Sequence, residues 1–403
     1  MEYGVPRQTK NCKSNLRFLP IYATITDMLT QGIYHCLLLL INLLLLRSIW
    51  RSSYTSFAQV RILAYLGIFA AVVLAIILTG ALEGRISAHF VLHGLAWHGS
   101  FFLFASAALI YRQKMNNAQP RRSLPLFLVL FGCFYCGVAV DALLIEPMAL
   151  VARETTITTP KITKPITIVF CSDLHIARVG DYERRTLQKI KEQNADLIFF
   201  GGDYVAGQTE EENQRLMKEW NQLFREMDLH APLGIYAVEG TRVHDWTSWQ
   251  KMFTDTEVIP YDDTLTKQIG EIRITFLSEV DSENKDFILD EYPADKFRMI
   301  VGHSPRYAMA EQKADLLLAG HTHGGQVQIP FWGPLITMSG DFPKKWASGM
   351  TTMPNGAKLI VSNGVGVSQG RGPRVRFWCR SDFWVIRLVP SDAFLRNVAY
   401  CIP

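Results

Sequence analysis

The feature that most limits the possible folds is a series of long apolar runs within the first 150 of the 403 residues. A helix that crosses a bilayer needs about 20 predominantly apolar residues. Four runs meet this length, near Gly32–Trp50, Ile62–Leu82, Ala88–Tyr111 and Leu124–Leu150. We therefore predict that residues 1–150 form a multi-pass membrane domain with four transmembrane helices.

The first run does not resemble a cleavable signal peptide. It begins some thirty residues into the chain and lacks the small-residue exit of a cleavage site. The anchor is therefore expected to stay on the mature protein and to hold it in the cell membrane.

Basic residues in the short loops give conflicting indications of topology. Four crossings put both chain ends on one side. The loops after the first and third runs are rich in Lys and Arg, whereas the loop between the second and third holds only Arg85. Because positive loops tend to stay in the cytoplasm, this asymmetry favours an extracytoplasmic C-terminal domain. The basic N-terminal tail, with Arg7, Lys10, Lys13 and Arg17, favours the opposite side.

Ionisable residues at membrane depth are functional candidates. His89, His93 and His98 fall in the third run, where they either bind a haem or metal ion or hydrogen-bond a neighbouring helix. Asp141 and Glu146 in the fourth run either face a cavity between helices or lie close to the membrane surface. A haem site would make the chain a redox or transport module with an accessory domain.

The rest of the chain reads as a soluble α/β domain. Residues 151–165 are rich in Thr, Lys and Pro and predict an extended linker. From residue 166 to 390, short apolar runs alternate with amphipathic stretches, which predicts strands separated by helices. Residues 391–403 are taken as a C-terminal tail. The net charge of +4 is too small to indicate nucleic-acid binding.

Potential metal ligands follow the predicted strands of this domain. In open α/β sheets, sites form beyond the carboxyl ends of the strands. The residues found there include Asp173 and His175, then Asp203, then His303, and lastly His321 and His323. Carboxylate and imidazole groups suit Mn, Fe, Zn and similar ions, and a metal pair can hold a phosphoryl group and activate water. Each motif alone is a weak signal, but the ordered set predicts a two-metal site.

The same motifs resemble those of the calcineurin-like metallophosphoesterase family. They are SDLH, GGDYV, the YAVEG turn, GHSP and GHTHGGQ, and the end of the chain looks like that of a membrane-associated bacterial branch. The resemblance covers about residues 165–390. It implies a two-sheet α/β sandwich with flanking helices and two divalent metal ions.

The resemblance also implies a role for each matching residue. Two ions are implied, with Asp203 bridging them and a metal-activated water attacking phosphorus in line. The first ion is assigned to Asp173, His175, Asp203 and His323, and the second to Asp203, His303 and His321.

One departure from the family pattern falls after the third strand. The family has Gly-Asn-His there, and this chain has Gly240-Thr241-Arg242-Val243-His244. Thr241 stands where Asn normally binds the second ion, and a hydroxyl is a poorer ligand than an amide carbonyl. Arg242 and His244 are both candidates for the catalytic group, because Arg can clamp phosphate oxygens and His244 keeps the His-Asp pairing.

These features predict a phosphoesterase that cleaves a phosphoester or pyrophosphate bond, with a membrane-bound, lipid-linked substrate suggested by the anchor. A UDP-diacylglucosamine-type pyrophosphate hydrolase is one alternative, and it would need a cytoplasmic site. Another is a degenerate domain that binds phosphate or a lipid head group without cleaving it. The oligomeric state stays open. Four aromatic residues are expected to pack on the sheets, or alternatively to contact acyl chains or the interface: Phe331, Trp332, Trp346 and Trp378.

Overall fold

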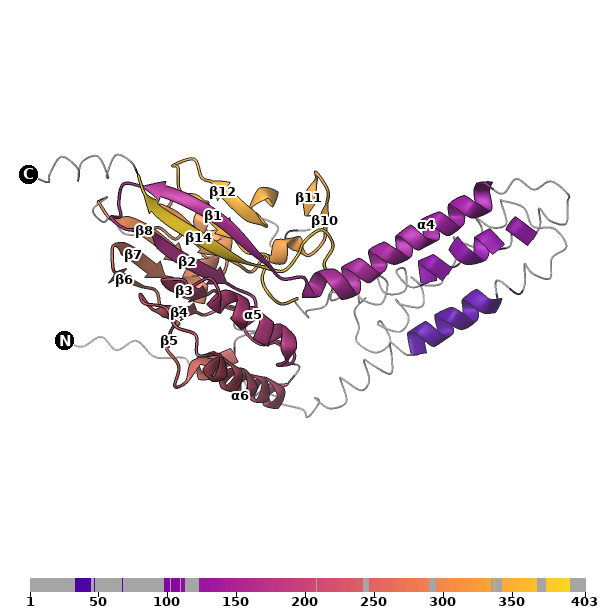
Figure 1. Cartoon of the computed structure of the whole chain (residues 1–403), viewed down its shortest axis with the longest axis horizontal. Helices are drawn as coiled ribbons and strands as arrows, with labels where there is room; N and C mark the ends of the chain where they lie inside the picture. Colours follow the sequence, from indigo (N-terminus) through magenta and orange to yellow (C-terminus); the bar gives the residue numbers. More distant parts are fainter. Residues whose placement is uncertain are drawn as a thin grey trace, which may run out of the picture.

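The computed structural model describes one long apolar helix next to an α/β domain (Figure 1). It describes residues 33–44, 47, 67, 98–112 without 102 and 109, and 123–391 without 208, 242–245, 290–294, 335–336, 338–342 and 368–374. Helix α4 (Ser123–Val140) continues through the π-helical η1 (Asp141–Ile145) and the 3-10 turn η2 (Glu146–Met148). The stretch Pro125–Met148 is the one helix in the described part that is long and apolar enough to cross a membrane.

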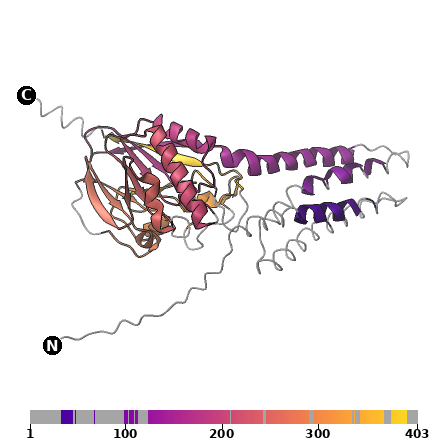
Figure 2. The same ribbon diagram turned by 90° about the horizontal axis from the view of Figure 1, so that it is seen from below.

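The predicted multi-pass arrangement falls largely outside the described residues. The run Ile62–Leu82 is described only at Gly67. The runs Gly32–Trp50 and Ala88–Tyr111 are described in part, the first as a shorter apolar helix at Ile33–Leu44. Figure 2 shows this helix lying alongside α4, with both on the same side of the α/β domain. The structure thus provides one candidate membrane span of the predicted four.

His98 makes hydrogen bonds with the first apolar helix. Its Nε2 lies 3.4 Å from Nδ1 of His35, and its Nδ1 lies 3.0 Å from Nδ2 of Asn42. These contacts match the interpretation of His98 as a residue that hydrogen-bonds a neighbouring helix. His89 and His93 lie outside the described residues.

The α/β domain consists of two six-stranded mixed sheets packed face to face, as the two-sheet sandwich prediction requires. The first has the order β1-β14-β2-β3-β4-β5 and the second β12-β13-β9-β8-β7-β6. The strands of the first sheet are β1 (Val151–Thr159), β2 (Ile166–Cys171), β3 (Leu197–Phe200), β4 (Ile235–Val238), β5 (Val258–Tyr261) and β14 (Asp382–Pro390). Those of the second are β6 (Leu265–Ile269), β7 (Ile272–Phe276), β8 (Phe297–Val301), β9 (Leu316–Ala319), β12 (Gly349–Thr352) and β13 (Lys358–Val361).

The segment 151–165, predicted as a linker, instead contributes strand β1. It pairs in parallel with β14 from Val151–Asp382 to Thr159–Pro390. Its β-branched residues favour a pleated, half-buried surface, and its side chains are alternately half-buried and exposed over most of its length. The prediction was wrong because the pairing partner lies more than 220 residues away in the sequence.

Apolar cores on both faces of the first sheet hold the domain together. Between the sheets, the ring of Phe199 packs against Tyr236 and Phe276, with ring centroids 5.9 and 6.1 Å away. On the outer face, α5 (Asp181–Lys191), α6 (Glu210–Met227) and η3 (Trp246–Phe253) cover a second cluster that includes Trp220. The second sheet has its own outer cluster, over which η4 (Pro305–Met309) packs.

Helix α6 illustrates how the sequence sets its bounds. The Thr209 side chain caps its N-terminus by accepting a hydrogen bond from the Glu212 backbone N–H at 3.1 Å. Three Glu residues in the first turn complement the helix dipole. Asp228 ends the helix in a left-handed conformation. The remaining helical elements are α8 (Glu279–Glu283), η5 (His323–Gly325) and η6 (Lys344–Trp346), and the two-stranded hairpin is β10 (Gln328–Ile329) with β11 (Gly333–Pro334).

Candidate metal centre

The predicted ligands lie at the carboxyl ends of neighbouring parallel strands. Asp173 and His175 follow β2, Asp203 follows β3, His303 follows β8, and the His321–His323 turn follows β9. Backbone hydrogen bonds connect these loops. The N–H of Asp173 donates to the Gly202 carbonyl (2.9 Å), and the N–H of Gly320 donates to the His303 carbonyl (2.8 Å). The site is therefore built from loops of both sheets at one edge of the sandwich.

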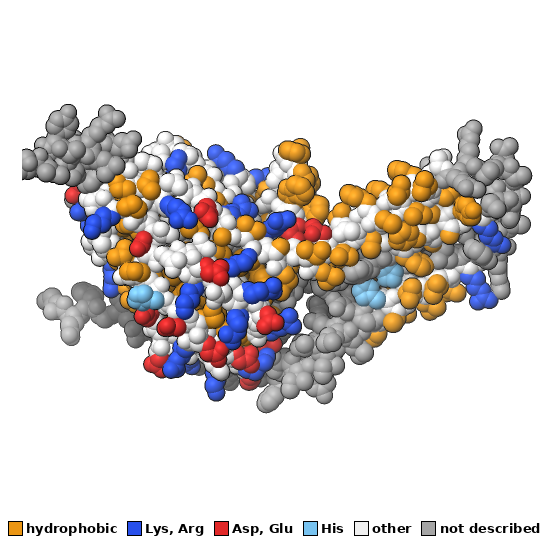
Figure 3. Space-filling view, in the orientation of Figure 1, with side chains coloured by type: hydrophobic (Ala, Val, Ile, Leu, Met, Phe, Trp, Pro, Cys, Tyr) orange, Lys and Arg blue, Asp and Glu red, His pale blue; other side chains and the backbone are white. Residues whose placement is uncertain are grey.

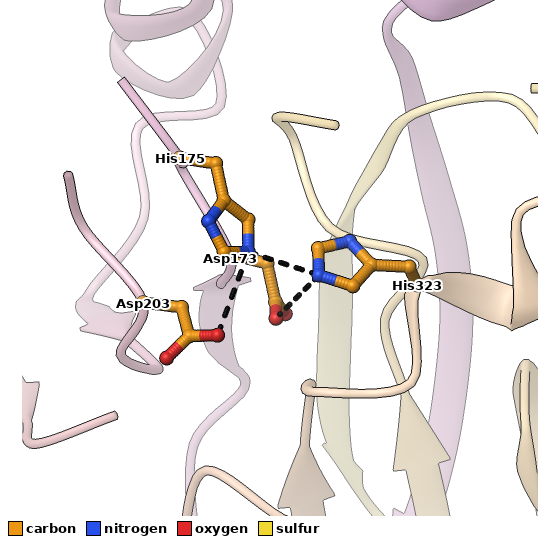
Figure 4. A group of neighbouring side chains, drawn as sticks. All are labelled: Asp173, His175, Asp203 and His323. Atoms are coloured by element: carbon orange, nitrogen blue, oxygen red, sulfur yellow. Dashed lines mark hydrogen bonds and ion pairs between the residues drawn. The ribbon is translucent and has the colours of Figure 1, made fainter. Parts of the chain in front are cut away.

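Four buried side chains form the first group (Figure 4). Each of Asp173, His175, Asp203 and His323 offers a ligand atom, and these atoms lie within 4.8 Å of one another. Nε2 of His175 lies 2.9 Å from Nε2 of His323 and 3.4 Å from Oδ2 of Asp203. Nε2 of His323 lies 3.5 Å from Oδ1 of Asp173. Two nitrogens and two carboxylates facing one point form a donor set that fits a divalent cation.

Asp203 also belongs to a second group with His303 and His321. Nε2 of His303 lies 3.3 Å from Oδ1 of Asp203 and 3.1 Å from Nδ1 of His321. On its other side, Nδ1 of His303 lies 2.8 Å from the Gly201 carbonyl. Because a carbonyl only accepts, Nδ1 carries a proton, and Nε2 is the ring nitrogen that faces the group and offers a lone pair when the ring is neutral. Asp203 is thus placed between two ligand sets.

Thr241, which stands at the family's Asn position, reaches the second group. Its backbone N–H donates to Oδ1 of Asp203 at 2.7 Å, and its Oγ1 lies 3.3 Å from Nε2 of His303. The two other residues predicted for this turn, Arg242 and His244, lie outside the described residues.

The site is electrostatically suited to positive charge. Burial, followed by the charge of Asp203, raises the pKa of Asp173 to about 6, against the lowering effect of His303. Burial lowers the pKa of His303, but the charge and hydrogen bond of Asp203 outweigh it and raise the pKa to about 10. Burial and the neighbouring His175 hold the pKa of His323 well below its usual value. The carboxylates therefore favour a positive charge between them, and His323 favours its neutral, metal-binding form.

Five of the ligand residues have a left-handed backbone, with φ between 39° and 68°: Asp173, His175, Asp203, His321 and His323. This region is uncommon for residues other than glycine. Such strain persists only where the surrounding structure imposes it, and it concentrates at functional sites. Here the buried loops and their backbone hydrogen bonds hold these turns.

Several residues that support the site were not predicted from the sequence. Ser172 Oγ donates to Oδ2 of Asp173 at 2.6 Å. Glu283 on α8 places a carboxylate oxygen 3.6 Å from Nε2 of His321. The Gly366 N–H donates to the Asp173 carbonyl at 2.7 Å. Such outer partners orient the ligands, and Ser172, adjacent to Asp173 in SDLH, was the only one with a sequence signal.

A fully buried arginine, Arg376, holds the loop after β13 against the site. Its guanidinium donates to the carbonyls of Asn363 (2.7 Å), Gly364 (3.2 Å) and Gly366 (2.6 Å), and also to that of Cys379 (3.0 Å). This loop contacts the metal centre directly, through the Gly366 hydrogen bond to Asp173.

The segment that carries Arg376 is also bound to the end of the apolar helix. Glu146, in η2, is buried, and its two carboxylate oxygens accept from the backbone N–H groups of Trp378 (2.8 Å) and Cys379 (2.5 Å). The Arg376 N–H donates to the Ala142 carbonyl at 3.0 Å. Glu146 therefore faces the α/β domain, not a cavity between membrane helices.

Comparisons with known proteins agree with this geometry. Residues 166–325 match the family model described as calcineurin-like phosphoesterase. The chain is 28% identical over 239 residues to the uncharacterized metallophosphoesterase YkuE of Bacillus subtilis, covering 56% of this chain and 79% of the relative. It is 21% identical over 310 residues to the uncharacterized metallophosphoesterase Cj0846 of Campylobacter jejuni, covering 73% and 76%.

A shorter match is to the phosphodiesterase YaeI of Escherichia coli, at 30% identity over 94 residues, which is 23% of this chain and 32% of the relative. The matched region 166–325 contains every ligand of the two groups. The α/β domain of this chain therefore resembles the calcineurin-like phosphoesterases over residues 166–325, and it carries the intact metal-binding residues of a metallophosphoesterase hydrolase.

Proposed function

We propose that the protein hydrolyses a phosphoester or pyrophosphate bond in a lipid-linked substrate at the membrane surface. The observation that carries the proposal is the pair of ligand groups sharing Asp203, connected through the segment of Arg376 and Cys379 to the end of a helix suited to cross a bilayer. A tethered site meets membrane-bound substrate at a raised effective concentration. The anchor is proposed to have four crossings, with the catalytic domain on the extracytoplasmic face.

The residues take the following roles in this proposal. Asp173, His175, Asp203 and His323 hold one divalent ion, such as Mn, Fe or Zn, and Asp203, His303 and His321 hold the other, with help from Thr241. When bound, such a pair neutralises phosphoryl charge and lowers the pKa of an attacking water. The Gly201 carbonyl and Glu283 fix the rings of His303 and His321 for this task. Arg242 and His244 remain the proposed catalytic groups of the turn after β4.

Hydrolysis of two chromogenic substrates tests the proposal. The purified full chain in detergent, loaded with Mn, is expected to hydrolyse bis(p-nitrophenyl) phosphate, because the related YaeI is named a phosphodiesterase. Both substrates release the same leaving group, so their rates can be compared. The protein is expected to act faster on a diacylglycerol p-nitrophenyl phosphate embedded in vesicles, because a tethered site meets it at a raised effective concentration. No turnover of either with any divalent ion would contradict the proposal. Binding of phosphate without turnover would support a degenerate binding domain instead, although the complete ligand set favours catalysis.

The UDP-diacylglucosamine-type alternative differs in the bond cleaved and in topology. It requires a pyrophosphate substrate and a cytoplasmic catalytic domain. A reporter fused after Pro403 shows the side of the membrane directly. A cytoplasmic reporter together with cleavage of that nucleotide lipid would favour this alternative over an extracytoplasmic phosphodiesterase.

Two variants of Thr241 test whether its hydroxyl serves the second ion. Thr241→Val removes the hydroxyl at nearly constant shape, and we expect the second ion to bind about tenfold more weakly. Thr241→Asn supplies an amide carbonyl, a better oxygen ligand, and is expected to strengthen binding. Titration of the metal-free protein with Mn, followed by calorimetry, measures both. Equal affinities in all three proteins would show that the side chain takes no part.

A further inference from the structure

A short hairpin beside the metal centre exposes large aromatic side chains. Strands β10 and β11 begin five residues after the ligand His323. At their tip, Phe331 is fully exposed and Trp332 is 73% exposed, and Ile329 on β10 is also exposed. Of the four aromatic residues that were expected to pack on the sheets, only Trp346 is buried. Large apolar side chains gathered at one exposed tip indicate a contact surface.

The hairpin is joined to the segment that binds the apolar helix. Val327 forms a parallel bridge with Phe377. The Gln328 N–H donates to the Phe377 carbonyl, and the Phe377 N–H donates to the Gln326 carbonyl, both at 2.9 Å. The next residue, Trp378, is bonded to Glu146 at the end of the helix. Figure 1 shows the hairpin beside the end of α4 that meets the domain.

The apolar surface of the helix Pro125–Met148 continues as far as the contact between Glu146 and Trp378. Leu144, Ile145 and Met148, in its last turns, are exposed to the outside of the protein. Figure 3 shows the apolar side chains of the helical region continuing up to the α/β domain. If lipid covers this surface, the membrane boundary lies where Glu146 enters the domain. Trp378, 64% exposed, is at that boundary, where Trp and Tyr favour the head-group region.

Basic side chains accompany the aromatic ones. Lys344 and Lys345, on η6, are exposed, and η6 packs beside β11. Arg380 is exposed two residues after Trp378. Lysine and arginine near a bilayer attract anionic head groups, and aromatic residues accompanied by basic ones fit a lipid surface better than an aqueous one.

We propose that the β10–β11 hairpin and Trp378 form a second membrane contact, which rests on the head groups of the bilayer that α4 crosses. Because the hairpin leads directly from His323, this contact holds the metal centre against lipid head groups and selects phosphate groups presented by the bilayer. The membrane contact requires only that α4 crosses the bilayer, while its consequence for substrate choice rests on the proposed lipid-linked substrate.

Quenching by brominated lipid tests the contact itself. The full chain is placed in nanodiscs of anionic lipid brominated near the start of the acyl chains. Tryptophan fluorescence of the native protein is compared with that of Trp332→Phe, so that the difference reports Trp332. We expect this difference signal to be quenched by brominated relative to ordinary lipid. Equal signals in the two lipids would overturn the proposal and leave a protein partner or a second copy as the occupant.

Hydrolysis by a double variant tests the consequence. We expect Phe331→Ser with Trp332→Ser to lower the rate on vesicle-bound diacylglycerol p-nitrophenyl phosphate about tenfold relative to the rate on bis(p-nitrophenyl) phosphate. Ile259→Ser, an exposed apolar residue on β5 at the opposite edge of the first sheet from β1, is the matched control and should leave the ratio unchanged.

An unchanged ratio in the double variant would overturn the link to substrate choice. The failure of the proposed function has a different signature. In that case the native protein hydrolyses neither substrate, or only the soluble one, while quenching of Trp332 still reports the contact.

Discussion

Replacing Asp203 by asparagine is expected to abolish nearly all phosphodiesterase activity and to lower the metal content of the purified protein. Its two oxygens are placed between the ligand groups, 3.4 Å from Nε2 of His175 and 3.3 Å from Nε2 of His303. The amide keeps the size of the side chain but removes the negative charge shared by both groups. The loss of several kcal/mol of charge stabilisation corresponds to about a thousandfold in rate.

Metal analysis and hydrolysis of bis(p-nitrophenyl) phosphate measure the two effects of Asp203→Asn. His321→Ala is a useful companion, because His321 belongs only to the second group. It should lower the content of one ion while the other stays bound. Asp263→Asn, an exposed position, is the matched control and should behave like the native protein. Native turnover in Asp203→Asn would disprove the assignment of the site.

Replacing Arg376 by methionine is expected to destabilise the protein by about 4 kcal/mol. Hydrogen bonds from a charged group contribute roughly 1.5–3 kcal/mol each, and the cost of burying the guanidinium offsets part of their sum. The four carbonyls belong to the loop that backs the metal centre and to Cys379. Methionine keeps the volume of the aliphatic stem but supplies no donor. For a domain of this size the change lowers the melting temperature by roughly 10 °C.

Thermal unfolding in detergent measures this loss, and hydrogen exchange in the loop 362–366 shows where it arises. Arg387→Met is the matched control, since Arg387 is exposed on β14 and pairs only with the exposed Glu154 at 3.3 Å among the contacts described. It should change the melting temperature by no more than a degree or two, as surface ion pairs contribute about 0–1 kcal/mol. A melting temperature equal to that of the native protein in Arg376→Met would mean that water replaces its hydrogen bonds.

The two-sheet sandwich and the ligand groups were predictable because their signals are local. Each ligand follows a short apolar strand such as Ile166–Cys171, and parallel strands bring their carboxyl ends to one edge. The amphipathic stretches between the apolar runs, predicted as helices, include α5 and α6. Local apolar patterns and a recurring Asp/His order sufficed for this part.

Other features depend on contacts between distant segments and have no local signature. Strand β1 lacks a continuous apolar run, and its partner β14 is found only at the end of the domain. The binding of Glu146 to the backbone of Trp378 and Cys379 joins residues 232 and 233 positions apart. The exposure of Phe331 and Trp332 depends on a hairpin too short to show a strand pattern.

Strand β1 has a practical consequence for making a soluble version of the enzyme. Cutting the chain near residue 160, where a linker was expected, would remove β1. Strand β14 would then become an unpaired edge strand prone to aggregation. It would also remove Arg153, whose Nε lies 2.6 Å from the fully buried carboxylate of Asp382. Expression of the catalytic half alone therefore has to start before Val151, so that strand β1 is retained.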